Sequence, residues 1–311
     1  MEVIWKGVFP AVTTKFTQND ELDFAAFDHS IEAQLEAGVD GIVLGGSLGE
    51  ASVLSDDEKI TLVEHTVKLV NNRVPVICNI AEQATKAAIN IGKKALDAGA
   101  DGLMLLPPMR YKADGHETVT YFTQIAKNVP LPIMIYNNPV DYGIKVTLEM
   151  FAQLAEQENI KAVKESTRDT TNAIRMYNHF GNRFSIFTGV DTLALESLCI
   201  GVDGWVAGLV NAFPKETVAI YRLAKAGRYA EALAIYRWFL PVLELDIHPK
   251  LVQYIKLAEA CSGIGTETVR APRLAITGEE RTNVLNIINT AIATRPALPA
   301  ESWGRLQSAI V

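Results

Sequence analysis

Lys164 is the residue whose type and position best fit covalent chemistry. It ends the short apolar run Ile160–Lys164, which predicts a buried strand with the lysine at its carboxyl end. An unprotonated lysine amine can form a Schiff base with a carbonyl carbon, but its ordinary pKa of about 10.4 must first be lowered by burial or positive charge. Lys15, Lys112 and Lys145 also follow predicted strands, but in loops, where burial is harder to maintain. A solvated lysine is the alternative.

Tyr136 could assist such a lysine. It lies at the end of the apolar run Pro132–Asn137, which immediately precedes the Lys164 run among the predicted strands. Neighbouring strands lie about 5 Å apart, so a phenol at this point could pass protons to and from an intermediate on Lys164. A tyrosine of the core or the rim is the alternative.

Two segments with glycine follow other predicted strands and could bind substrate. In Gly45–Glu50, glycine lets the backbone approach a ligand, and consecutive N–H groups with the Ser47 hydroxyl can hold a carboxylate. A tight structural turn is the alternative there. Further on, Gly189 could admit ligand and Asp191 could bind substrate hydroxyls, although capping of the next helix explains Asp191 more simply.

These residues need a fold that brings strand ends together. Short apolar runs alternate with amphipathic segments, and their near-continuous apolar character is typical of strands covered on both faces. The predicted strands are Gly7–Thr13, Gly41–Gly45, Pro75–Ile80, Gly102–Leu106, Pro132–Asn137, Lys161–Lys164, Phe184–Thr188 and Gly204–Ala207. Eight such strands alternating with helices predict an α/β fold, a (β/α)₈ TIM barrel, whose reacting groups gather at the carboxyl ends of the strands.

An internal repeat supports the barrel. The pattern Gly-x-Asp-Gly occurs at Gly38–Gly41, Gly99–Gly102 and Gly201–Gly204, each time between a predicted helix and a predicted strand. Beyond about Pro214 the pattern changes to helices without intervening strands. We therefore expect a barrel over residues 1–226 and a C-terminal helical extension, packed on the barrel, over residues 227–311.

Composition argues against several classes of partner. The 311 residues carry a formal net charge of −7 without a cluster of Lys and Arg, so we expect no nucleic-acid partner. No apolar run approaches the length of a membrane span and no secretory leader is visible, so we expect a cytoplasmic protein without a membrane partner. Three widely spaced cysteines predict neither disulfides nor zinc.

Metal and nicotinamide chemistry are two alternatives to the lysine route. A metal-dependent aldolase needs several ligands that converge on the barrel mouth, and the histidines do not predict such a set. They are His29, His65, His116 and His179 in helical segments and His248 in the extension. A dinucleotide enzyme needs Gly-x-Gly-x-x-Gly between a strand and a helix, and no segment has that context. We expect neither a metal nor an organic cofactor.

Three motifs together carry a resemblance to a known family. They are the segments Gly46–Glu50, of the pattern G-[ST]-x-G-E, Tyr136–Pro139, and the strand end Lys164–Ser166. In order and spacing the chain resembles the dihydrodipicolinate synthase/N-acetylneuraminate lyase family of lyases, and the similarity runs from Gly7 through at least Pro214.

The resemblance implies roles for the candidate residues. Lys164 would form the imine and Tyr136 would shuttle protons, while Ser47 and the backbone from Gly46 to Leu48 would hold the carboxylate of a 2-oxo acid. It also implies a homotetramer and no metal or organic cofactor.

Two departures from the family pattern concern the rest of the substrate. Asp141 stands where the synthases carry an arginine that binds the carboxylate of the second substrate, which argues against aspartate semialdehyde. Thr192 follows Asp191 where sialic acid lyases carry a glutamate, so a long polyol tail is poorly supported.

Two further departures concern proton transfer. Leu48 replaces the second threonine of the synthase motif, and the tyrosine expected shortly after Pro107 is absent. The usual relay is therefore missing or rebuilt, through Tyr111 or Tyr142.

The segments Pro107–Lys112 and Tyr136–Gly143 look most like a subgroup linked to hydroxyproline breakdown. That likeness implies deamination and dehydration of 1-pyrroline-4-hydroxy-2-carboxylate, with transimination by Lys164. The alternative is a pyruvate-dependent enzyme, either dihydrodipicolinate synthase or an aldolase for 2-keto-3-deoxy sugar acids. If the protein is not an enzyme, the alternative is a barrel that binds 2-oxo acids without converting them.

Overall fold

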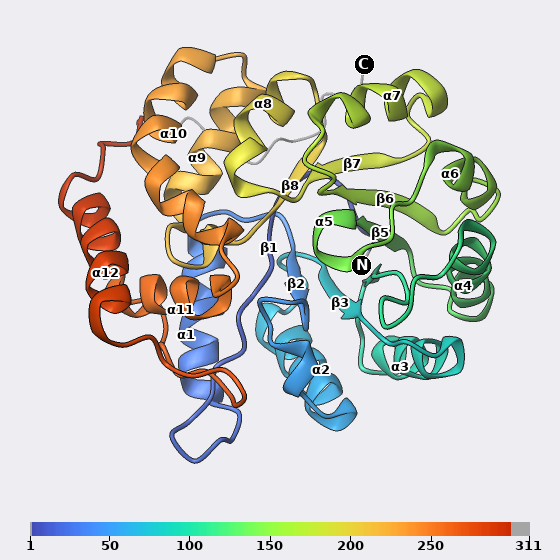
Figure 1. The fold of residues 1–311 in the computed structure, drawn as a ribbon, viewed down its shortest axis with the longest axis horizontal. Helices are drawn as coiled ribbons and strands as arrows, with labels where there is room; N and C mark the ends of the chain where they lie inside the picture. Colours follow the sequence, from blue (N-terminus) through green and yellow to red (C-terminus); the bar gives the residue numbers. More distant parts are fainter. Residues whose placement is uncertain (1, 300–311) are drawn as a thin grey trace.

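The apolar runs form one parallel sheet that closes on itself. In the computed structural model, which describes residues 2–299, the strand order is β1-β8-β7-β6-β5-β4-β3-β2, and a parallel bridge from Ala11 to Val43 joins the outer strands. The eight strands of this described part are β1 (Gly7–Pro10), β2 (Ile42–Leu44), β3 (Val76–Ile80), β4 (Gly102–Leu105), β5 (Ile133–Asn137), β6 (Ile160–Glu165), β7 (Ser185–Thr188) and β8 (Gly204–Ala207). The predicted (β/α)₈ barrel is confirmed (Figure 1).

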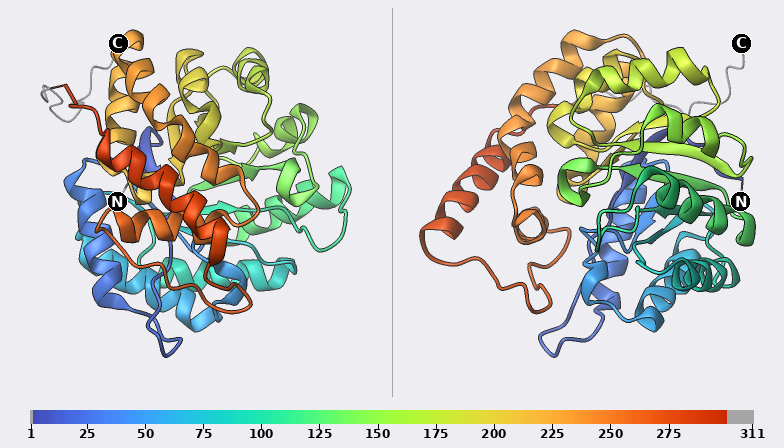
Figure 2. Two further views of the ribbon diagram at one scale, coloured as in Figure 1. Left: turned by 60° about the vertical axis from the view of Figure 1, so that its left-hand side comes forward. Right: turned by 45° about the vertical axis from the view of Figure 1, so that its right-hand side comes forward.

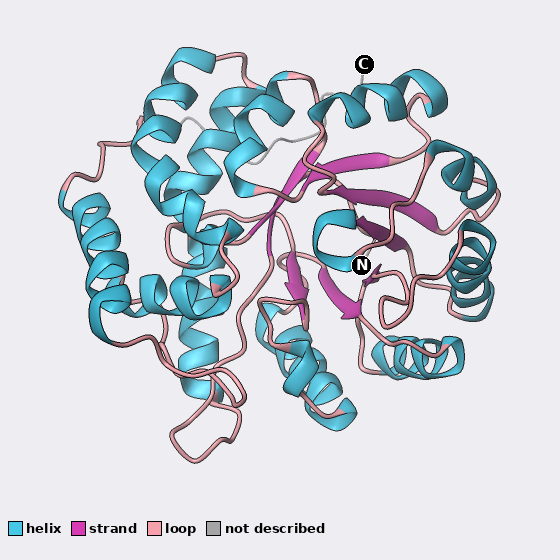
Figure 3. Ribbon diagram, in the orientation of Figure 1, coloured by secondary structure: helices cyan, strands magenta, loops and turns pink. Residues whose placement is uncertain are grey.

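Helices surround the strands (Figure 3). The α-helices are α1 (Phe24–Glu36), α2 (Asp56–Val70), α3 (Thr85–Asp97), α4 (Gly115–Asn128), α5 (Pro139–Tyr142), α6 (Leu148–Leu154), α7 (Thr170–Phe180), α8 (Ala194–Cys199), α9 (Pro214–Lys225), α10 (Tyr229–Leu243), α11 (Leu251–Cys261) and α12 (Gly278–Ala293). Short 3₁₀ turns are η1 (Ala51–Val53), η2 (Asp191–Leu193), η3 (Leu209–Asn211) and η4 (Glu244–Ile247). Polar side chains cap α1 and α6, where Asp23 and Thr147 accept hydrogen bonds from backbone N–H groups.

The three Gly-x-Asp-Gly segments have the same structural role. In each copy the aspartate precedes a strand and its carboxylate accepts a hydrogen bond from the backbone N–H of a neighbouring strand. The pairs are Asp40 with Val8 at 2.8 Å, Asp101 with Val76 at 2.9 Å, and Asp203 with Ile186 at 2.9 Å. The repeat therefore ties successive strands together at the end of the barrel opposite the candidate site.

The C-terminal helices α10, α11 and α12 pack on one flank of the barrel (Figure 2). This confirms that helices without strands follow Pro214. The boundary between residues 226 and 227 stays a prediction, and residues 300–311 of the predicted extension lie outside the described residues. No helix among residues 2–299 combines the length and the apolar character needed to span a membrane.

Two buried ion pairs join α11 to the loops of the barrel. Lys256 Nζ lies 2.5 Å from Glu50 Oε1, and Lys15 Nζ lies 2.6 Å from Glu259 Oε1, with all four side chains fully buried. Glu50 directly follows the loop that carries Ser47 and has a left-handed backbone, with φ of 55°. Helix α11 therefore fixes the loop that is predicted to hold the substrate carboxylate.

Replacing Lys256 with methionine is expected to lower the free energy of unfolding by about 3–5 kcal/mol, because it leaves the buried Glu50 carboxylate without its main counter-charge. Urea denaturation at one fixed protein concentration measures this change. The double variant Lys256→Met/Glu50→Gln removes both charges and should recover part of the loss. An unchanged unfolding curve for the single variant would show that the pair contributes little.

Candidate active site

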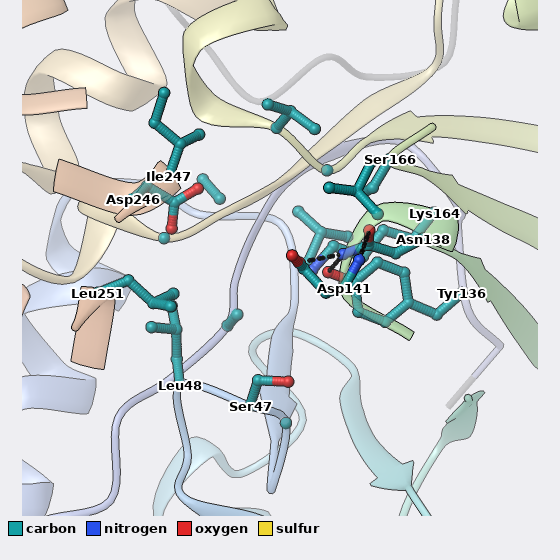
Figure 4. A pocket seen from close by; sticks show the side chains of 18 of the residues that line it. Ser47, Leu48, Tyr136, Asn138, Asp141, Lys164, Ser166, Asp246, Ile247 and Leu251 are labelled. Carbon is teal, nitrogen blue, oxygen red and sulfur yellow. Dashed lines mark hydrogen bonds between the residues drawn. The ribbon is translucent and has the colours of Figure 1, made fainter. Parts of the chain in front are cut away.

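A cavity of about 500 Å³ opens at the carboxyl ends of the strands, a volume that suits a small metabolite. Seven of the eight residues predicted to form the site line it (Figure 4): Gly46, Ser47, Leu48, Tyr136, Asp141, Lys164 and Gly189. The eighth, Asp191, does not. Segments that lie far apart in the sequence therefore meet at one place, as the barrel topology predicts.

Lys164 lies on the cavity wall near the end of β6. Its Cα pairs in register with that of Tyr136 on β5, and its Nζ lies 4.1 Å from the centre of the Tyr136 ring. The side chain is only 7% exposed, and this burial lowers the pKa of the amine, although nearby acidic groups oppose the shift. The position thus favours the unprotonated form that a nucleophile requires.

Tyr136 is placed to give up a proton. The Asn138 side-chain amide donates to its hydroxyl oxygen at 3.2 Å, which leaves the phenolic hydrogen available to a group in the cavity. Burial raises the pKa of Tyr136 to about 12, so the phenol stays protonated at neutral pH. Asn138 also donates to the Asp141 carboxylate at 2.6 Å, which holds this part of the wall in place.

Tyr142 supplies a hydroxyl where Leu48 has none. Its oxygen lies 2.5 Å from Ser47 Oγ, and its ring meets the edge of the Tyr136 ring with centroids 5.5 Å apart. Tyr111, in contrast, is 56% exposed and does not line the cavity. Of the two tyrosines that could replace the usual proton relay, Tyr111 and Tyr142, the geometry favours Tyr142.

Gly189 leaves room for the reactive lysine. A Cβ atom at this position would lie 2.6 Å from Lys164 Cε and 2.3 Å from Ser166 Oγ, closer than real contacts allow. The glycine after β7 is therefore required for the packing of the Lys164 side chain, and its predicted role in admitting ligand stays a prediction.

The substitution Gly189→Ala is expected to slow imine formation roughly a hundredfold, because the added methyl group must displace the Lys164 side chain by about 1 Å. Borohydride trapping of a 2-oxo acid measures the rate. Gly115→Ala is the matched control, since its Cβ would meet the nearest atom at an ordinary 3.6 Å. Equal trapping rates for the two variants would contradict the requirement for space beside Lys164.

The prediction that Asp191 caps the following helix is wrong, and the geometry does not support contact with substrate. Its carboxylate accepts hydrogen bonds from Trp205 Nε1 and from the backbone N–H groups of Gly208 and Leu209, at 2.7 to 3.1 Å. The side chain is 1% exposed. Asp191 therefore anchors the loop after β8, because backbone N–H groups of that loop satisfy its charge.

Several cavity residues were not singled out from the sequence as site residues. Asn138, Ser166 and Arg168 follow β5 or β6, close to residues that were predicted. Asp246 and His248 come from the C-terminal extension, from η4 and the residue after it. Position after a strand could have indicated the first three, but no local pattern indicates that η4 reaches the barrel mouth.

Asp246 brings an acid from the extension to the cavity wall (Figure 4). Its carboxylate packs against Gly208, where a Cβ would lie 2.4 Å from Asp246 Oδ1. Burial, with the charge of Asp191, raises the pKa of Asp246 well above its usual value. The cavity thus holds a carboxyl group that is a proton donor at higher pH than an ordinary aspartate.

The competing lysines lie away from the cavity. Lys112 and Lys145 are exposed and do not line it. Lys15 is buried although it lies in a loop, because Glu259 on α11 pairs with it. Among the described residues no group of three or more His, Cys, Asp or Glu side chains is placed to hold a metal ion.

Comparison with known proteins agrees with this geometry. The profile of the Dihydrodipicolinate synthetase family matches residues 4–291. The 4-hydroxy-tetrahydrodipicolinate synthase of Oceanobacillus iheyensis is 32% identical over 286 residues, which cover 91% of this chain and 96% of that enzyme.

Solved structures show the same similarity. The 4-hydroxy-tetrahydrodipicolinate synthase from Methylacidiphilum fumariolicum SolV gives a TM-score of 0.89 at 27% identity, over 93% of this chain and 96% of that one. A chloride-inhibited dihydrodipicolinate synthase from Acinetobacter baumannii, complexed with pyruvate, gives 0.87 at 25% identity, over 93% of this chain and 99% of that one. The chain therefore belongs to the Dihydrodipicolinate synthetase family, and it is an enzyme of the lysine Schiff-base lyase class, whose imine chemistry uses neither a metal nor an external cofactor.

Proposed function

We propose that this enzyme is a pyruvate-dependent lyase of the synthase or aldolase type, with Lys164 as its nucleophile. The observation that carries the proposal is the buried amine of Lys164 beside Tyr136, at the ends of neighbouring strands. The relatives named above support it, because they are 4-hydroxy-tetrahydrodipicolinate synthases and one solved structure contains pyruvate.

The reaction follows from the positions of these groups. Lys164 attacks C2 of pyruvate and water leaves, which gives an imine; loss of a methyl proton gives an enamine. The enamine carbon adds to the carbonyl carbon of an aldehyde, and the aldehyde oxygen takes a proton from the Tyr136 hydroxyl. Tyr142, bonded to Ser47, can return a proton to Tyr136. Water then hydrolyses the imine and frees the product and the lysine.

Product analysis tests this proposal. The purified enzyme is incubated with pyruvate and L-aspartate semialdehyde, and in parallel with pyruvate and aldehydes derived from sugar acids. Consumption of pyruvate together with an aldehyde supports the proposal. Loss of ammonia from 1-pyrroline-4-hydroxy-2-carboxylate, with no consumption of pyruvate by any aldehyde, would contradict it.

Deamination of that cyclic imine is the second candidate, and one observation favours it. Two acids line the cavity, Asp141 and Asp246, and either could protonate a leaving hydroxyl or amine. The relatives described above do not support this reading, because they carry the name of the synthase. The pyruvate-dependent function therefore stands first.

The predicted homotetramer stays a prediction, as does the cytoplasmic location. Sedimentation of the purified enzyme would test the first of these directly.

A further inference from the structure

Two polar side chains at the end of β6 have no use in the reaction described so far. The Ser166 hydroxyl lines the cavity, is 1% exposed, and has no hydrogen-bond partner within 3.5 Å among the described residues, although it lies near the Tyr136 hydroxyl. Arg168 also lines the cavity, and its guanidinium forms no hydrogen bond or ion pair within residues 2–299. A buried hydroxyl without a partner costs free energy, so it indicates a ligand or water that is bound during function.

The backbone of Arg168 is in the left-handed region, with φ of 61°, where glycine is favoured. A long, charged residue at this position carries a strain of roughly 1–2 kcal/mol. Its neighbour Asp169 does not explain it, because the Asp169 carboxylate pairs with Arg175 on α7. The backbone strain at Arg168 therefore favours a binding role for its guanidinium in the cavity.

The charges around the cavity are unevenly distributed. Asp141 on α5 and Asp246 on η4 each bring a carboxyl group to its lining. Lys164 and Arg168 are the Lys and Arg residues that line it within the described part of the chain, and the Lys164 amine is used to form the imine. A second anionic group on a substrate would be attracted to the Arg168 guanidinium and not to these carboxyl groups.

We propose that Ser166 and Arg168 form a subsite for a carboxylate at the far end of the substrate, so that the enzyme takes acceptors that carry a carboxylate. The planar guanidinium can bind both carboxylate oxygens, and the Ser166 hydroxyl can donate a third hydrogen bond. This deepens the proposed function and rests on it. A positive group on the same acceptor would meet Asp141 or Asp246. An aldehyde that carries both a carboxylate and a positive group therefore matches Arg168 and these two acids.

Borohydride trapping of two 2-oxo acids of equal length tests the subsite without the need for turnover. 2-Oxoglutarate has a distal carboxylate and 2-oxopentanoate has a methyl group in its place. In the parent enzyme we expect half-maximal trapping of 2-oxoglutarate at a concentration roughly ten- to hundredfold lower than that needed for 2-oxopentanoate. In Arg168→Gly this preference for 2-oxoglutarate should disappear. Arg168→Lys should keep only part of the preference, because a lysine ammonium cannot bind both carboxylate oxygens as the planar guanidinium can.

Two controls separate the subsite from folding. Arg168→Gly should not lower the melting temperature, because glycine relieves the left-handed strain. Arg175→Ala, an arginine of α7 that does not line the cavity, should keep the full preference for 2-oxoglutarate.

The outcomes distinguish the two proposals. If Lys164 traps both acids but Arg168→Gly retains the parent preference, or if the parent has no preference, the subsite is wrong while the Schiff-base function stands. If the parent traps no 2-oxo acid at all, including pyruvate, the proposed function fails and the subsite fails with it.

Discussion

Replacing Lys164 with alanine is expected to lower kcat/KM by a factor on the order of 10⁴ or more, because no other lysine of the described residues lines the cavity to form the imine. Steady-state kinetics with pyruvate and the preferred aldehyde measure the loss. Lys145→Ala is the matched control, since Lys145 is exposed and does not line the cavity, and it should keep the parent rate. Comparable rates for Lys164→Ala and the parent would rule out Lys164 as the nucleophile.

The pH dependence of the same step follows from burial. Because burial lowers the pKa of Lys164, the fraction of unprotonated amine at a given pH is larger than for an ordinary lysine. The rate of imine formation should therefore rise with pH and reach its plateau below the ordinary value of about 10.4. A rate that still rises in proportion to hydroxide above that value would mean that the cavity does not activate the amine.

Replacing Tyr136 with phenylalanine is expected to lower kcat roughly 10²- to 10⁴-fold, the usual contribution of a positioned acid or base. The ring and its packing against Lys164 remain, so only the proton carried by the hydroxyl is lost. Single-turnover kinetics with pyruvate and an aldehyde would locate the loss in the steps after imine formation, while trapping of pyruvate alone should persist.

Tyr111→Phe provides the comparison for Tyr136, because the Tyr111 phenol is exposed and lies away from the cavity. It should retain nearly the full kcat. If Tyr136→Phe and Tyr111→Phe had the same small effect, proton transfer would have to run through another group, such as Asp246.

The barrel could be predicted from the sequence because each strand is buried on both faces. That burial requires continuous apolar runs, and the runs of β5 and β6 alone predict that Tyr136 and Lys164 lie near adjacent strand ends. The order of parallel strands then fixed which residues meet. A site formed at strand ends is therefore accessible to sequence analysis.

Groups that depend on packing across the fold were not accessible in this way. Asp246 reaches the cavity only because η4 folds back over the end of β8, and nothing in its local sequence indicates that contact. The role assigned to Asp191 failed for the same reason, since its partners Trp205 and Leu209 belong to the next βα unit. Its position in the sequence suggested a cap, but tertiary hydrogen bonds determine its orientation.

The substrate could be predicted least. Asp141 in place of an arginine indicated a loss of anion binding, yet Arg168, on the loop after β6, brings a guanidinium to the cavity. One substituted position therefore does not fix the charge that a cavity offers, because a group on a neighbouring loop can supply it. The relatives favour the synthase over the deaminase that Asp141 suggested.

Mass mapping of the trapped adduct tests the central assignment most directly. The enzyme is reduced with borohydride in the presence of pyruvate, digested, and its peptides are sequenced by mass spectrometry. The account predicts one modified residue, Lys164, and no modified peptide when pyruvate is omitted. A pyruvate adduct on Lys15, Lys256 or a surface lysine, with the Lys164 peptide unmodified, would contradict it.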